Sequence, residues 1–163
     1  MIRDDHIIKR DRMRYTKDKL SSRLVLFAIV LDALYFVSIY RSDVGSYYYS
    51  WVIGASIVYN LLFMLAAFLA SEGVKSRKKG YTPALIVLGL MQAARMFYLP
   101  ARAHSATIIL KETELAVMSD GQYLYVMVCL GLSAICCIAA AVISYINNKK
   151  LSEYLQSIEH KTA

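Results

Sequence analysis

The chain has 163 residues and a mass of 18.4 kDa, with 58% hydrophobic residues and only 19% charged residues. A typical soluble domain is about 45–50% apolar and about 25% charged, so the composition excludes a disordered, a collagen-like or a Pro/Gly-rich chain. Three cysteines are too few for a disulfide framework. The net charge is +7, and its distribution along the chain decides whether nucleic acid is an expected partner.

Four apolar segments are long enough to cross a bilayer, which takes about 20 residues in a helix. They are residues 24–40, 51–71, 82–100 and 122–146. None alternates with the period of two that is typical of a barrel strand. Since backbone groups in lipid must be hydrogen-bonded within the segment, the sequence predicts an all-α integral membrane protein, a bundle of four transmembrane helices.

The basic residues predict how this bundle is oriented. Fifteen lysines and arginines lie in residues 1–23, 72–81 and 147–163. Because basic residues remain on the cytoplasmic side, we expect a multi-pass protein of the plasma membrane with both termini in the cytoplasm. The basic charge then follows from topology, and we expect no nucleic-acid partner. The other side of the membrane has three: Arg41, Arg102 and Lys111.

Three segments lie outside the spans. Residues 1–23 are basic, and Asp5 and Lys9 stand four apart, which supports an amphipathic helix on the lipid surface or on a cytoplasmic partner. In the outer loop 101–121 we expect a short helix, capped by Ser105 or Thr107. The tail 147–163 is expected to continue the fourth helix, with four apolar residues at helical spacing. These are Leu151, Tyr154, Leu155 and Ile158.

Aromatic residues gather before the second span. Tyr47, Tyr48, Tyr49 and Trp51 lie within five positions of one another. Amphipathic rings settle at the headgroup level of a bilayer, so we interpret these residues as membrane-interface anchors. A ligand platform made of the three tyrosines is the alternative interpretation.

Five polar residues fall at a similar depth, one or more from each span: Asp32, Asn60, Gln92, Arg95 and Ser133. With a rise of about 1.5 Å per residue, Asp32 lies roughly 13 Å and Arg95 roughly 20 Å from the inner edge. An arginine side chain is long enough to close this difference. The sequence thus predicts a polar layer in the bundle interior.

Three interpretations of this layer stay open. In the first, Asp32 and Arg95 form a structural pair that sets the helix register. In the second, one or both face a helix of a partner protein. In the third, the layer binds a substrate, an ion or a proton.

The fourth span carries small residues at every fourth position, namely Cys129, Ser133, Cys137 and Ala141. Small residues let membrane helices approach closely, so we interpret this stripe as a helix-packing surface. His6, His104 and His160 lie in separate polar segments, so no metal site is expected.

The sequence contains no enzyme motif of the kinds that carry hydrolytic, nucleotide-binding or zinc chemistry. We therefore expect no enzyme and no cofactor. The leading hypothesis is a small non-catalytic subunit or accessory protein that packs its helices against partner membrane subunits within the lipid bilayer. The alternative is a self-assembling transporter or channel that uses the Asp32–Arg95 layer.

Overall fold

The computed structural model describes residues 17–40, 50–78, 80–105, 107–110, 113–116 and 118–162, with side chains for 17–40, 54–78, 80–105 and 118–157. Helices make up nearly all of these residues. The elements are α2 (Lys19–Tyr40), α4 (Ser50–Lys75), α5 (Tyr81–Met96), α6 (Leu99–Ser105), β1 (Thr107–Leu110), β2 (Thr113–Ala116) and α7 (Asp120–Thr162).

Four stretches of helix are long and apolar enough to cross a membrane: Lys19–Tyr40, Gly54–Lys75, Tyr81–Ser105 and Asp120–Ser157. Large apolar side chains point outward from them, and Leu61, Leu90 and Ile135 are each more than half exposed. An apolar outer surface of this extent is unusual for a soluble monomer and suits contact with lipid. The four helices indicate a multi-pass membrane protein.

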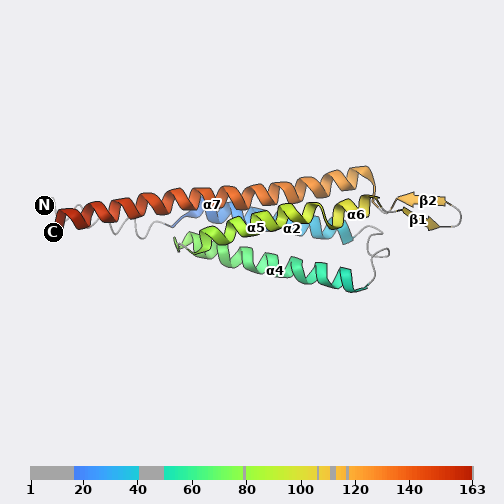
Figure 1. The fold of residues 1–163 in the computed structure, drawn as a ribbon, viewed down its shortest axis with the longest axis horizontal. Coiled ribbons are helices and arrows are strands. Elements are labelled where there is room, and N and C mark those ends of the chain that lie inside the picture. The colour runs from blue at the N-terminus through green and yellow to red at the C-terminus, as the bar shows by residue number, and fades with distance from the viewer. Residues whose placement is uncertain are drawn as a thin grey trace.

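The helices form one elongated bundle in which α7 is the longest member (Figure 1). Helices α2 and α5 both pack along α7, and α4 packs mainly on α2. The chain passes directly from α4 to α5 through a short turn, so these two helices are antiparallel neighbours. The β1–β2 hairpin lies beyond one end of the bundle, and α7 continues beyond the other end (Figure 1).

Helix α2 begins at Lys19, five residues before the predicted span. Asp18 caps it, because its Oδ1 accepts a hydrogen bond from the backbone N–H of Ser21 at 3.2 Å. The N-terminal segment predicted as 1–23 therefore ends in the bundle, and Asp18 is only 5% exposed. The helix predicted around Asp5 and Lys9 lies outside the described residues.

The third span predicted over 82–100 lies within the candidate span Tyr81–Ser105, which the structure divides into two helices. Helix α5 ends at Met96, and α6 starts again at Leu99. Pro100 explains the break, because it has no backbone N–H and its ring would clash with the carbonyl of the residue four positions earlier, Met96. In the first turn of α6 the missing N–H costs nothing.

The prediction of a short helix in loop 101–121, capped by Ser105 or Thr107, is wrong. Strands β1 and β2 pair antiparallel there, with Thr107 opposite Ala116 and Leu110 opposite Thr113. Ser105 is the last residue of α6 instead of the cap of a further helix. The run Thr107-Ile108-Ile109 is β-branched, and such side chains favour strands over helices.

Helices α5 and α7 approach closely at Gly89. A Cβ atom at this position would lie 2.8 Å from Cγ1 of Ile138 and 3.2 Å from the carbonyl oxygen of Ala134. The stripe predicted for the fourth span, Cys129, Ser133, Cys137 and Ala141, is buried along its whole length. The absence of a side chain on α5 and the small side chains on α7 thus let the two helices meet.

We expect Gly89→Leu to destabilise the protein by about 1–3 kcal/mol, because the added side chain overpacks the α5–α7 contact. The measurement is thermal unfolding in mild detergent. Gly54→Leu is the matched control, since a Cβ at Gly54 meets no atom within 4 Å. An equal loss of stability in both variants would contradict the close approach at Gly89.

Candidate functional site

Polar residues separate two apolar clusters along the bundle axis. The first cluster lies toward the α4–α5 turn and includes Val25, Ala28, Phe63, Ala67, Ala70, Val74, Leu85, Cys137, Ala140 and Ala141. The second lies toward the hairpin and includes Tyr35, Ile39, Leu99, Ala103, Met118, Val126, Cys129 and Leu130. On α2, Asp32 falls between Ala28 of the first and Tyr35 of the second. The charged groups of the site are therefore enclosed by apolar layers on both sides.

Asp32, Gln92, Arg95 and Ser133, here called the polar cluster, meet between these layers. The guanidinium Nη1 of Arg95 donates a hydrogen bond to Asp32 Oδ1 at 3.1 Å, which makes an ion pair. Gln92 Nε2 donates to the same oxygen at 2.8 Å and lies 3.4 Å from the Ser133 hydroxyl. The Ser133 hydroxyl in turn donates to the backbone carbonyl of Ala28 at 3.1 Å. One carboxylate oxygen thus joins α2 to α5, and Ser133 adds α7.

Helix geometry explains why Gln92 and Arg95 reach the same carboxylate. They are three residues apart and share one face of α5. Asp32 is completely buried and Arg95 is 8% exposed, so both charges are largely removed from solvent. Removing two charges from water costs several kcal/mol for each ion, and the attraction between them offsets that cost only while both are present.

Two tyrosines cover the guanidinium of Arg95. Its central carbon lies 4.4 Å from the centroid of the Tyr35 ring and 4.9 Å from the centroid of the Tyr59 ring. Both distances are within the range of a cation–π interaction. Because Tyr59 belongs to α4, this contact brings the remaining helix to the site. The sequence analysis did not single out Tyr59, although it directly precedes Asn60 and lies at nearly the same depth.

Asn60 itself is not part of this hydrogen-bonded group. It is 1% exposed, but within the described part of the chain no hydrogen bond joins its side chain to Asp32, Gln92, Arg95 or Ser133, and its Oδ1 is unpaired. Four of the five residues predicted for the layer are therefore linked by hydrogen bonds, and the fifth, Asn60, is buried without a hydrogen bond to them.

The polar cluster retains unused hydrogen-bonding groups. Among the described residues, Asp32 Oδ2, Gln92 Oε1 and Arg95 Nη2 have no hydrogen-bond partner. Buried polar atoms without partners are uncommon in native proteins, and each one calls for a physical explanation.

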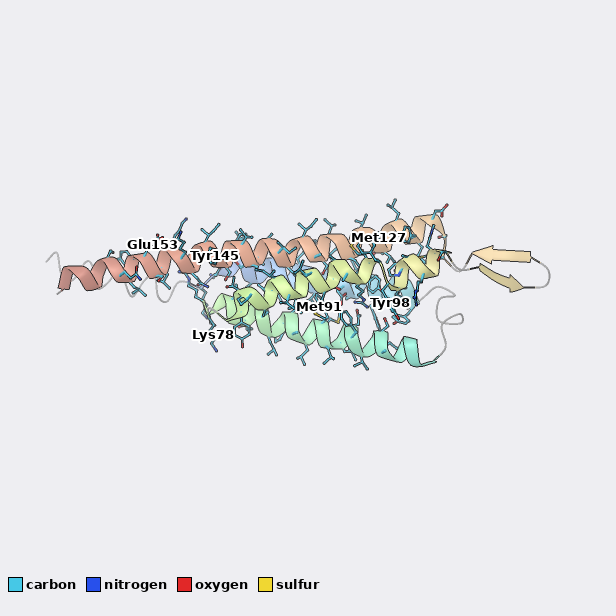
Figure 2. The ribbon with its side chains drawn as sticks, viewed as in Figure 1. Lys78, Met91, Tyr98, Met127, Tyr145 and Glu153 are labelled. Atoms are coloured by element: carbon cyan, nitrogen blue, oxygen red, sulfur yellow. The ribbon has the colours of Figure 1, made fainter. Side chains whose placement is uncertain are left out.

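A groove of about 510 Å³ between α4 and α5 reaches the polar cluster. Arg95 and Tyr59 form its polar wall, and Met91, Ala94 and Tyr98 line it along α5 and the turn that follows. Met91 and Tyr98 are labelled in Figure 2, in the region between the α5 and α4 ribbons. The groove therefore offers an apolar space with one cationic side chain in its wall.

A second set of polar contacts, which the sequence analysis missed, ties the helices together near the α4–α5 turn. The Ser22 and Ser71 hydroxyls are 2.8 Å apart, and those of Thr82 and Ser144 are 3.1 Å apart. Asn147 Nδ2 also donates to Asp18 Oδ2 at 3.0 Å. The available signal was a small hydroxyl residue at the end of each apolar run, directly beside the basic segments.

The predicted membrane-interface anchors fall outside the side chains that the structure describes. Tyr47, Tyr48 and Tyr49 are outside the described residues, and Trp51 belongs to α4 with a side chain that is not described. His104 Nε2 lies 2.9 Å from Asp120 Oδ1 at the exposed end of α7. The part of the chain that is described contains no group of three or more His, Cys, Asp or Glu residues arranged to hold a metal ion.

Comparisons with protein-family models, with curated proteins and with solved structures found no match to this chain.

We expect Asp32→Leu or Arg95→Leu alone to cost roughly 3–5 kcal/mol of stability, because each leaves a buried charge without its partner. The double variant is expected to be far less destabilised than the sum of the two. A double-mutant cycle on thermal unfolding in detergent measures this coupling. Additive single effects would show that the two side chains do not interact.

Proposed function

We propose that this chain is a small non-catalytic subunit or accessory protein of a larger complex in the plasma membrane. Its partners are the lipid bilayer and other membrane subunits. Both termini lie in the cytoplasm, since residues 1–23, 72–81 and 147–163 carry fifteen of the lysines and arginines.

The observation that carries this proposal is the length of α7. A helix of 43 residues is about 64 Å long, which is about twice the hydrocarbon thickness of a bilayer. Figure 1 shows its C-terminal part continuing well past the ends of α4 and α5. A rigid helix that projects from a membrane bundle is suited to attach another protein.

The projecting part of α7 has two different faces. Leu151, Tyr154 and Leu155 recur at helical spacing on one side, and Lys149 and Glu153 lie on the other, 3.8 Å apart. An isolated helix shorter than about 15 residues is only marginally stable in water. The projecting part of α7 is therefore stabilised when another surface covers its apolar face. We interpret the apolar face as the contact with a partner subunit.

The polar cluster supports the same proposal. Asp32 is completely buried, and its Oδ1 accepts hydrogen bonds from both Arg95 and Gln92. A carboxylate held in this way serves to set the helix register, as polar groups do in other membrane bundles.

A self-assembling transporter or channel is the second candidate. The unpaired Asp32 Oδ2 and Arg95 Nη2, together with a groove that reaches Arg95, are the observations that favour it. In that case Asp32→Asn would leave assembly intact and abolish flux in liposomes.

The orientation is tested with two single cysteines on α7, introduced into a chain whose three native cysteines are replaced by alanine. Gly121 and Gln156 are both exposed and lie at the two ends of this helix. A membrane-impermeant maleimide added to intact cells should label Gly121→Cys, and should label Gln156→Cys only after the cells are opened. The reverse pattern would overturn the orientation.

The subunit role is tested by purification from native membranes in mild detergent, with an affinity tag on the N-terminus. We expect other membrane proteins to copurify in a fixed ratio. Replacing Leu151, Tyr154 and Leu155 by alanine should remove them, because the apolar face of the projecting helix is lost.

The matched control replaces Lys149, Glu153 and Gln156, which lie on the opposite face of the same helical segment, and should retain the partners. Recovery of the chain alone, as a homo-oligomer that supports flux in liposomes, would contradict the subunit role and favour the transporter.

A further inference from the structure

A second groove lies between the start of α5 and the part of α7 that leaves the bundle. Its volume is about 480 Å³, with Pro83 and Ile86 on α5 and Tyr145, Asn148, Lys149 and Ser152 on α7 among its lining residues. Figure 2 shows Tyr145 on α7 at the same level along the bundle as Lys78, which lies in the turn between α4 and α5. The groove is therefore at the end of the bundle where the apolar spans give way to basic segments.

This groove crosses the boundary between hydrocarbon and headgroups. Lys149 follows Asp120, the first residue of α7, by 29 residues, which is about 44 Å along a helix. A bilayer with its headgroup regions is about 40–45 Å thick. With the start of α7 at the opposite surface, Lys149 lies at headgroup level, and Ile86 and Tyr145 lie at the edge of the hydrocarbon.

The two halves of the groove differ in chemistry. Pro83, Ile86 and the ring of Tyr145 form an apolar wall, and Ile86 and Tyr145 are 44% and 62% exposed. About one helical turn further along α7, Asn148, Lys149 and Ser152 provide hydrogen-bond donors. A ligand that fits both halves has a polar head and an apolar chain.

The polar half favours a negatively charged head. Lys149 lines the groove with a side chain that is 64% exposed, and among the described residues no acidic side chain lines it. Glu153 lies 3.8 Å from the Lys149 ammonium and is itself 63% exposed, so this ion pair is weak. The ammonium is therefore accessible to an anionic ligand.

We propose that this groove binds an anionic glycerophospholipid of the cytoplasmic leaflet, with its phosphate on Lys149 and an acyl chain along Ile86 and Tyr145. Basic pockets between membrane helices on the cytoplasmic side recognise anionic headgroups in this way. A lipid fits better than a free phosphate because the apolar wall continues directly from the cationic end. The choice of leaflet rests on the orientation proposed above, whereas the binding chemistry does not.

The test is a lipid titration of the purified full chain in a neutral detergent, with bound lipids counted by native mass spectrometry. Phosphatidylglycerol and phosphatidylcholine with identical acyl chains are the two probes. We expect one phosphatidylglycerol to bind about tenfold more tightly, because the cationic choline of phosphatidylcholine opposes the contact between phosphate and lysine. The purified chain has no partner subunits and no sidedness, so a failure here is distinct from a failure of the proposed function.

Two neighbouring lysines provide a matched pair of variants. Lys149→Gln should bring the preference for phosphatidylglycerol close to unity, and Lys149→Arg should retain it, since a guanidinium also binds phosphate. Lys150→Gln removes the same charge from an exposed residue that does not line the groove, and should leave the preference unchanged. Both lysines are exposed, so we expect the helical circular dichroism of all three variants to match that of the wild type.

The lipid site and the partner contact lie on different sides of α7. The apolar face of the projecting helix contains Leu151, Tyr154 and Leu155, and none of these residues lines the groove. The triple replacement that includes Lys149 should therefore retain the partner subunits and lose the lipid preference.

Four results would overturn the proposal. Equal affinity for the two lipids would mean that acyl chains fill the groove without selection by the lysine. An equal loss with Lys149→Gln and Lys150→Gln would mean that the basic charge acts diffusely. Displacement of phosphatidylglycerol by an equal concentration of glycerol phosphate would indicate a site for a free phosphate. The absence of any bound lipid would leave the groove to a partner helix.

Discussion

The ion pair between Asp32 and Arg95 is the interaction on which the arrangement of the helices depends. A charge enclosed by apolar clusters is tolerated only with an opposite charge and hydrogen bonds close by. Asp32 can satisfy this condition only if α5 lies at one level and one rotation relative to α2, with Gln92 and Arg95 facing it. The contact of Ser133 with Gln92 and with the Ala28 carbonyl then sets α7 against the same point.

The two ends of the bundle are stabilised in different ways. Near the α4–α5 turn, hydroxyl pairs link α2 to α4 and α5 to α7, and Asp18 caps α2 while bonding Asn147. Near the hairpin, Pro100 cannot donate the backbone hydrogen bond that would continue α5, and it lies in the first turn of α6. Small residues on α7 and Gly89 on α5 keep the helices close between these ends.

Arg95 connects α5 with both α2 and α4. One guanidinium nitrogen, Nη1, donates a hydrogen bond to Asp32, and the other, Nη2, is buried without a hydrogen-bond partner among the described residues. Helix α4 covers this guanidinium through Tyr59 and packs mainly on α2.

Hydropathy alone determined that the chain contains four apolar helices, since a run of about 20 apolar residues has few alternatives to a spanning helix. Depth along each helix also predicted one polar layer of five residues, and the structure joins four of them by hydrogen bonds and leaves out Asn60. The predicted residues were Asp32, Asn60, Gln92, Arg95 and Ser133. Local sterics were visible at Pro100, where α5 gives way to α6 within the third span. They were misjudged at the β-branched residues that pair as a hairpin. The tertiary structure alone decided that Tyr59 and not Asn60 meets Arg95. Adjacent residues on a helix share a depth but point in different directions, and the rotation of a helix about its axis is set by packing against its neighbours.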